Sequence, residues 1–200
     1  MSGYSLEEIA GHYGRMSDDH LRKIIVGKAR DLKPGVMEII EAEISRRKLD
    51  TDILRAAYVQ SREYSYEELV NYADIVRSQN CPYCGRSKYR LNGSTSHIVR
   101  SFVLFSVTNV MEIIACPDCL DKRNNAAIRT SLLMGFWSFE GLYKTPMMIY
   151  RNVQAKTVNK QAGASEVLLA FIQENIGLIE LHKNDPEQLR LILLKKGSLI

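Results

Sequence analysis

The sequence is poor in several features that commonly identify a protein class. Its 200 residues include one tryptophan, five prolines and a net charge of only +4. A charge this small does not by itself indicate a nucleic-acid-binding protein. With 46% hydrophobic and 25% charged residues, the composition is that of an ordinary globular protein and excludes wholesale disorder. The length allows one medium domain or two small ones.

A secretory signal and a membrane-spanning helix are also missing from the sequence pattern. The N-terminal residues MSGYSLEEI contain no basic region followed by an apolar run. The longest apolar-leaning stretch, residues 126–150, is interrupted by Arg129, Glu140 and Lys144. Each such charge at the middle of a bilayer costs about 2.5–3.5 kcal/mol on insertion scales. We therefore expect a cytoplasmic protein that is soluble or at most peripheral to a membrane.

No catalytic constellation stands out in the sequence. There is no nucleophile–base pair, no glycine-rich phosphate loop and no pair of carboxylates at a suggestive spacing. His12, His20 and His182 are scattered along the chain and form no group. We therefore expect a protein that is not an enzyme.

What the sequence does contain is two matched cysteine pairs, with no cysteine left over. Cys81 and Cys84 form the first Cys-x-x-Cys pair, and Cys116 and Cys119 form the second. Each pair can present two thiolates from one tight turn, and a β-hairpin between the pairs would bring the two turns together. In a chain without an export signal this pattern favours metal over disulfides. We predict one structural zinc ion held by these four residues.

Other interpretations of the cysteines compete with structural zinc. The tetrapeptide Cys81-Pro82-Tyr83-Cys84 also occurs in glutaredoxins, but those proteins need an apolar strand before it and a helix directly after it, whereas both flanks here are polar. Iron uses the same four-thiolate set and stays open as an alternative ion. A catalytic zinc ion needs an open coordination position, which four thiolates do not leave. His97 lies between the pairs and could replace one ligand, although a surface position is favoured for it.

The pattern along the chain predicts an α+β fold in three parts. Residues 1–79 form a small helical module, residues 80–146 a zinc ribbon with a following aromatic helix, and residues 147–200 C-terminal helices. Helix starts are indicated by the capping boxes Ser5/Glu8 and Ser65/Glu68. Further starts are expected at Ser17, Pro34, Asp50 or Thr51, Ser165 and Asp185. After Pro146 the chain is expected to be less regular, with a loop at residues 158–164.

The hairpin between the cysteine pairs is predicted from β-branched and aromatic residues. Residues 98–107 and 110–115 are the expected strands, with Thr108-Asn109 as the turn between them. The preceding residues 92–96 are expected to form a turn. Phe102 and Phe105 are expected in the core of the hairpin.

Positive charge is concentrated around the cysteines. Residues 81–130 carry seven basic and three acidic side chains, an excess equal to the net charge of the whole chain. With Tyr83 and Tyr89 interleaved, this face could contact phosphates and stack on bases. A solvated surface of mixed charge is the favoured alternative. The basic residues in question are Arg86, Lys88, Arg90, Arg100, Lys122 and Arg123.

The most unusual composition lies in residues 132–144. Four aromatic residues fall within eight positions there, and two glycines interrupt them. This aromatic segment could form core packing or a partner surface, which is the favoured interpretation. Aromatic residues at this density with Lys144 and Arg151 nearby could also anchor the protein in a membrane interface.

The order of these motifs resembles a family. A Cys-Pro-x-Cys turn, a strand pair, Ala115-Cys-Pro-Asp-Cys-Leu-Asp-Lys122 and a Leu-Leu-x-Gly-aromatic-Trp segment occur together in poorly characterised bacterial zinc-ribbon proteins. In that group the aromatic segment usually reads Gly-Trp-Trp-Gly, whereas here it reads Gly135-Phe136-Trp137-Ser138. The resemblance covers roughly residues 80–146 and implies a zinc ribbon embedded in helices, with no activity or partner attached.

Two functions follow as hypotheses. The first is a non-enzymatic adaptor or assembly protein that binds a protein partner, with peripheral membrane contact through residues 132–144 as a variant. The second is a nucleic-acid-binding protein that uses the basic face of the hairpin.

Overall fold

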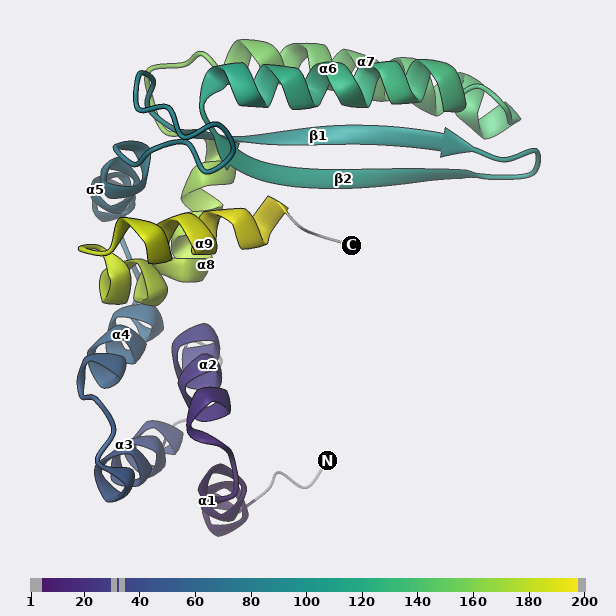
Figure 1. The fold of residues 1–200 in the computed structure, drawn as a ribbon. Coiled ribbons are helices and arrows are strands. Elements are labelled where there is room, and N and C mark those ends of the chain that lie inside the picture. Colours follow the sequence, from purple (N-terminus) through teal and green to yellow (C-terminus); the bar gives the residue numbers. More distant parts are fainter. Residues whose placement is uncertain (1–4, 30–31, 33–34, 198–200) are drawn as a thin grey trace. The chain divides into compact units, whose positions relative to one another are not determined.

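The computed structural model describes residues 5–29, 32 and 35–197, and it confirms the α+β class (Figure 1). The regular elements among the described residues are helices and one antiparallel hairpin. The chain divides into two compact units. The first consists of Met1–Leu69 with Ile172–Asn184, and the second of Val70–Phe171 with Asp185–Ile200.

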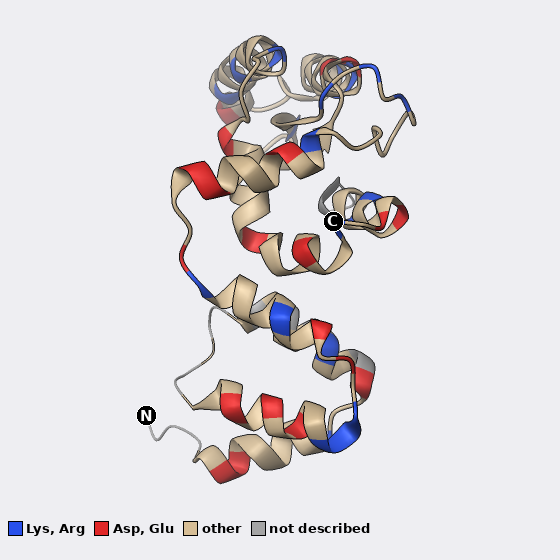
Figure 2. Ribbon diagram, turned by 90° about the vertical axis from the view of Figure 1, so that its left-hand side faces the viewer, with Lys and Arg blue, Asp and Glu red and all other residues tan. Residues whose placement is uncertain are grey.

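Among its described residues, the first unit contains helices and no strand. Their bounds are α1 (Leu6–Gly14), α2 (Asp18–Lys28), α3 (Val36–Arg47), α4 (Asp52–Ser61), the beginning of α5 (Tyr66–Arg77) and most of α8 (Glu166–His182). Figure 2 shows acidic and basic positions interspersed along the N-terminal helices, as expected for a solvated surface. The core between these helices is formed by buried aliphatic side chains, including Leu21, Ile25, Ile40, Ile44 and Ile53.

The helix starts predicted from capping residues are confirmed where the structure describes them. Ser5 and Glu8 form a complete capping box, and Ser65 and Glu68 form a second one. The Ser17 hydroxyl accepts a bond from the His20 N–H at 3.4 Å. Thr51 occupies the N-cap of α4, and the adjacent Asp50 carboxylate accepts from the Asp52 N–H at 2.9 Å. The start expected at Pro34 lies outside the described residues.

A polar side chain explains a bend in α8. Asn175 has non-helical angles (φ −125°, ψ 17°) inside this helix. The buried Gln60 side chain of α4 donates to the carbonyls of Gln173 and Glu174 at 3.2 and 3.3 Å, and it accepts from the Gly177 N–H at 2.9 Å. A side chain inserted into the hydrogen-bond ladder is a known cause of helix kinks.

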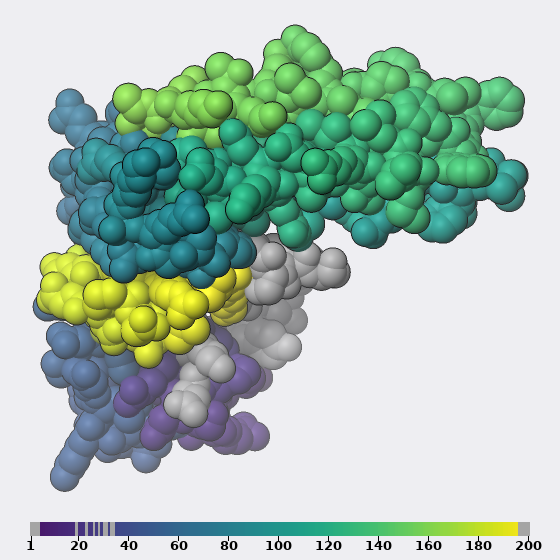
Figure 3. All heavy atoms as spheres, turned by 45° about the horizontal axis from the view of Figure 1, so that its top comes forward, coloured from purple at the N-terminus to yellow at the C-terminus, as the bar shows by residue number. Residues whose placement is uncertain are grey.

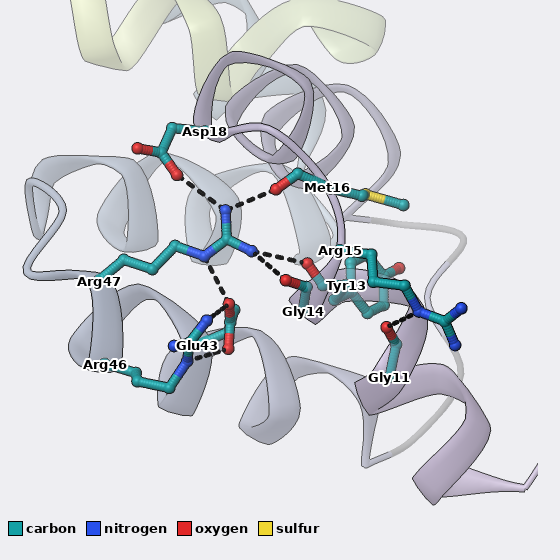
Figure 4. A network of polar contacts seen from close by, with 9 residues as sticks. All are labelled: Gly11, Tyr13, Gly14, Arg15, Met16, Asp18, Glu43, Arg46 and Arg47. Atoms are coloured by element: carbon teal, nitrogen blue, oxygen red, sulfur yellow. Dashed lines mark hydrogen bonds and ion pairs between the residues drawn. The ribbon is translucent and has the colours of Figure 1, made fainter.

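Arg47 ties three helices of the first unit together, and sequence patterns gave no sign of it (Figure 4). Its guanidinium donates to the carbonyls of Tyr13 and Gly14 at the C-terminal end of α1, both at 3.0 Å. It also bonds to the Met16 carbonyl at 2.6 Å and to Asp18 at 2.8 Å. Within α3, Glu43 accepts from Arg47 as well as from Arg46. The network adds a charged donor to the carbonyls at the end of α1, including that of Tyr13, which also accepts from the Met16 N–H at 3.2 Å.

The second unit is built on the hairpin. Strand β1 (Asn92–Ser101) pairs antiparallel with β2 (Ser106–Ala115), from Asn92 opposite Ala115 to Ser101 opposite Ser106. Helices α6 (Pro117–Met134) and α7 (Phe139–Val158) both pack on β1, and α9 (Pro186–Gly197) packs on β2. At about 3.3 Å per residue, each ten-residue strand extends for about 30 Å. The hairpin is therefore a long arm with the cysteines at its base.

Two expectations for this region are wrong. Thr108 and Asn109 lie inside β2 opposite Val99 and Ile98, and the turn is at residues 102–105 instead. The polar run at residues 92–96 is not a turn but the beginning of β1. Asn and Thr fit a strand here because the neighbouring strand satisfies their backbone groups, whatever their turn propensity.

The chain after Pro146 is also more regular than predicted. Helix α7 continues through Pro146 to Val158, and Pro146 is exposed within it. A proline inside a helix cannot donate to the carbonyl four residues earlier, which here belongs to Leu142, an exposed residue. The loop expected at residues 158–164 is confirmed from Asn159 onward. No described helix is both long enough and apolar enough to cross a lipid bilayer.

Candidate functional site

The first cysteine pair lies on a tight turn that precedes β1. The Gly85 N–H donates to the Cys81 carbonyl at 2.8 Å, and the Cys81 N–H donates to the Arg86 carbonyl at 3.0 Å. Gly85 has φ +71°, a left-handed conformation that a residue without a side chain adopts most easily. The turn therefore depends on the glycine that directly follows Cys84.

The second pair opens helix α6. Cys116 is the N-cap residue, Pro117 occupies the first helical position, and the N–H groups of Cys119 and Leu120 both donate to the Cys116 carbonyl at 3.0 Å. Proline suits this position because its missing N–H would have no helical partner there. The helix start places the Cys116 and Cys119 side chains one turn apart on the same side.

The four sulfur atoms converge at the base of the hairpin. All lie within 4.8 Å of one another, and Cys84 Sγ is 3.7 Å from Cys116 Sγ. In a tetrahedral site with metal–sulfur bonds of about 2.3 Å, sulfur atoms are about 3.8 Å apart. The donor set and its spacing therefore fit one tetrahedral metal ion of the kind that Cys₄ sites hold.

The environment of the thiols differs between the ligands. Cys81 and Cys116 are fully buried, whereas Cys84 is exposed. Burial raises the pKa of the Cys116 and Cys119 thiols, and the backbone hydrogen bond from Arg86 lowers the pKa of Cys84 to about 7. The Cys116 N–H donates to Cys81 Sγ at 3.4 Å, which links the two cysteine pairs directly. A metal ion would have to displace the remaining protons on binding.

His97 does not join the cysteine group. It lies in β1, where its backbone N–H and carbonyl bond to the Asn152 side chain of α7 at 2.8 and 2.7 Å. The ring is half-buried, and burial together with the charge of Arg151 lowers its pKa. Its Nδ1 atom has no hydrogen-bond partner among the described residues. His97 is thus neither a metal ligand nor a plain surface residue.

The basic residues near the cysteines are partly neutralised. Arg86 pairs with Asp118 at 3.8 Å, and Arg90 pairs with Asp74 at 3.0 Å. Lys88 lies over the ring of Tyr89, 5.1 Å from its centroid. Tyr83 and Tyr89 are partly exposed. This arrangement is that of a mixed-charge surface around the cysteine pairs.

At the opposite end of the hairpin, large apolar side chains are exposed. The turn Phe102-Val103-Leu104-Phe105 is open to solvent, with Leu104 91% exposed, so the expectation that Phe102 and Phe105 form hairpin core is wrong. The α6–α7 corner lies at the same end (Figures 1 and 3) and includes Trp137 at 72% and Phe139 at 93% exposure. We call this set the apolar tip; it consists of Phe102, Val103, Leu104, Phe105, Leu132, Leu133, Met134, Phe136, Trp137, Phe139, Leu142 and Tyr143.

Polar groups lie beneath the apolar tip and fix its two parts to each other. Ser101 and Ser106 hydroxyls are 2.9 Å apart, and Ser106 bonds to the Ser138 hydroxyl at 2.7 Å. The Gly135 carbonyl accepts from Ser101 and from Thr145, and the Ser106 N–H donates to Glu140 at 3.0 Å. Ser138 and Thr145 are buried and Ser101 and Ser106 are partly buried, whereas the large apolar side chains of the tip are exposed.

Two glycines of the aromatic segment, Gly135 and Gly141, allow the α6–α7 corner to lie close to the end of the hairpin. A Cβ atom at Gly135 would overlap Thr145 and the Ser131 carbonyl, and one at Gly141 would overlap the Gly135 carbonyl and the Ser101 hydroxyl. The spacing of glycines among aromatic residues was visible in the sequence. The serines and the apolar turn were not recognised, because nothing in the sequence marks them as one cluster.

Comparison of the chain with protein-family models, with curated proteins and with solved structures gave no match.

Proposed function

We propose that this chain is a non-enzymatic docking protein stabilised by zinc. One Zn²⁺ bound by Cys81, Cys84, Cys116 and Cys119 closes the base of the hairpin, and the hairpin presents the apolar tip to a partner surface. The single observation that carries this proposal is the apolar tip, whose exposed side chains adjoin a partly buried network of serine hydroxyls.

Zinc is the ion we assign to the cysteines. Four thiolates at tetrahedral spacing form a closed structural site, with no position open for a substrate. The resemblance of residues 80–146 to bacterial zinc-ribbon proteins supports the same ion. Reduced thiolate ligands suit a cytoplasmic protein, where disulfides are rare.

The apolar tip supports docking because exposed apolar surface of this extent is uncommon on a protein that acts alone. Covering one phenylalanine or leucine side chain contributes about 1.5–3 kcal/mol. The network of Ser101, Ser106 and Ser138 holds the turn and the α6–α7 corner together before any partner arrives. A preorganised surface loses less conformational entropy on binding.

Nucleic-acid binding is the weaker proposal. Two of the six basic residues that motivated it, Arg86 and Arg90, are paired with carboxylates, and Arg100 lies near the other end of the hairpin from the cysteines. Phosphate contacts would make binding fall steeply with salt. Retention of the protein on DNA or RNA at low ionic strength, lost as salt rises, would favour this alternative over docking.

Site-specific photo-crosslinking in the native cell tests the docking proposal. A photo-reactive residue at Leu104 should form adducts, whereas the same residue at Val153 should not. Val153 is an apolar control on α7, 51% exposed and outside the apolar tip. Equal labelling at the two positions, or none at either, would show that the tip is not a docking surface.

A further inference from the structure

The apolar tip carries a charge pattern that indicates which surface it meets. Residues 97–111 contain one charged side chain, Arg100, and residues 125–147 contain three, Arg129, Glu140 and Lys144. Glu140 is paired with Lys144 and also accepts from the Ser106 N–H. Arg100 and Arg129 are exposed, and neither forms an ion pair with another described residue. The free end of the arm is therefore apolar at its outermost positions and positively charged behind them.

The aromatic content of the apolar tip is that of a membrane interface. The apolar tip contains the only tryptophan of the chain, Trp137, together with five other exposed aromatic residues, Phe102, Phe105, Phe136, Phe139 and Tyr143. Tryptophan and tyrosine are enriched where hydrocarbon meets headgroups, and tryptophan, phenylalanine and leucine form the apolar face of segments that lie in this interface. The Trp137 indole N–H donates to the Leu133 carbonyl at 3.0 Å, so this polar group is already satisfied.

The backbone of the hairpin turn is suited to shallow insertion. The Phe102 N–H donates to the Phe105 carbonyl at 2.7 Å, and the Phe105 N–H donates to the Phe102 carbonyl at 3.2 Å. Only Val103 and Leu104 lie beyond this closed pair. Unpaired backbone groups oppose entry into an apolar phase, and this turn keeps their number small.

We propose that the apolar tip inserts into the interface of a bilayer that contains anionic lipids, with Arg100 and Arg129 facing the headgroups. This inference rests on the proposed docking function and names its partner. A second copy of the chain is a poorer occupant, because tip-to-tip contact would bring two positively charged ends together. Insertion is peripheral, since it uses two neighbouring chain turns and no spanning helix.

Trp137 makes the proposal directly measurable, because the chain contains no other tryptophan. The full-length protein is mixed with vesicles of phosphatidylcholine, with and without phosphatidylglycerol. We expect cosedimentation, a blue shift of tryptophan emission and quenching by brominated acyl chains with the anionic vesicles. The protein should bind vesicles of pure phosphatidylcholine more weakly by a factor of about ten or more, because the basic residues then meet no anionic headgroups.

Matched variants identify the inserting residues. Leu104→Glu and Phe139→Ser should each weaken partition about tenfold or more, because each removes apolar area from the inserted surface. Val153→Glu should leave partition unchanged. Because Leu104 and Phe139 are almost fully exposed, their replacement should leave the circular dichroism spectrum and thermal midpoint as in the parent.

The outcomes separate this inference from the docking proposal. Absence of vesicle binding at low salt, or binding that Leu104→Glu and Phe139→Ser leave intact, overturns membrane insertion. If the Leu104 crosslinker then labels a protein while Val153 does not, docking stands and only the lipid partner is wrong. If Leu104 labels nothing, both proposals fall.

Discussion

At the scale of single residues, Arg47 has more partners than any sequence rule assigns to it. It serves the C-terminal carbonyls of α1, Asp18 at the start of α2 and Glu43 within its own helix. Its side chain is 13% exposed, whereas that of the neighbouring Arg46 is 65% exposed and bonds to Glu43 alone. We therefore expect Arg47 to contribute more to stability than Arg46, because only Arg47 donates to carbonyls at and after the end of α1.

Replacing Arg47 by Met should destabilise the protein by about 2–3 kcal/mol, because several carbonyls and two carboxylates lose a charged donor at once. Arg46→Met is the matched control, and an exposed ion pair of this kind contributes about 1 kcal/mol or less. Urea unfolding followed by circular dichroism measures both. Equal losses for the two variants would show that the Arg47 network does not stabilise the first unit.

Glu43 gives this network a dependence on pH. The hydrogen bond from Arg46, supported by that from Arg47 and opposed by burial, lowers the pKa of Glu43 from 4.5 to about 2. Because the folded-state pKa lies below the unfolded one, the stabilisation is complete above pH 4.5 and is lost as pH falls towards 2. Unfolding free energy should therefore decline across that window, and Glu43→Gln should make the decline shallower. A parent and a variant with the same slope would contradict the assignment.

At the scale of elements, the corner between α6 and α7 depends on contacts that only glycine permits. Gly141 lies against the Gly135 carbonyl and the Ser101 hydroxyl, so α7 starts directly against β1. The Ser101–Ser106–Ser138 chain then joins both strands to the corner. Packing of this kind fixes where the aromatic residues emerge.

Gly141→Ala should destabilise the protein by about 1–3 kcal/mol, because a methyl group has to push the corner away from the hairpin. Near-ultraviolet circular dichroism of Trp137 should change along with the loss in stability. Gly163→Ala is the control, since nothing lies within 4 Å of the added Cβ there, and its effect should stay within about 0.5 kcal/mol. A Gly141→Ala protein as stable as the control would refute close packing at the corner.

Local signals in the sequence predicted the elements better than their long-range pairing. Helix starts at Ser5, Ser17 and Ser65 follow from a side chain and an N–H three residues later, which sequence alone specifies. The hairpin turn was misplaced because Val103-Leu104 carries no turn residue, whereas Thr108-Asn109 does. The real turn follows from the strand register, in which Ser101 pairs with Ser106 and their hydroxyls bond to each other.

Of the two candidate sites, the cysteine group could be predicted from the sequence, whereas the apolar tip could be predicted only in part. The cysteines were recognised because Cys-x-x-Cys spacing is set by local ligand geometry. The apolar tip was half recognised, as an aromatic segment whose exposure was undecided. Its second half, residues 102–105, is 30 positions earlier in the sequence, and only the α6–α7 packing on β1 brings the two together.

At the scale of the whole molecule, the chain forms two compact units, and we expect different interactions to stabilise each of them. The first unit has a core of aliphatic side chains and contains no cysteine. The second unit contains all four cysteines at the point where the loop before β1 meets the start of α6. We therefore expect metal binding to be coupled to the folding of the second unit alone.

Removing the metal should therefore destabilise the second unit and leave the first unit folded. Protein purified without chelators should contain about one zinc per chain by elemental analysis, as a single Cys₄ site requires. Chelation, or Cys116→Ser, should remove the ion and unfold the hairpin, because buried thiols then lose the bond that holds the two cysteine turns together. Hydrogen exchange should quicken in peptides from residues 92–158 and stay slow in peptides from residues 36–61.

Slowly exchanging strands in the metal-free protein would show that packing of α6 and α7 suffices without the ion. Metal-dependent protection confined to the second unit would mean instead that the tip, about 30 Å along the arm, keeps its shape only while the base is closed.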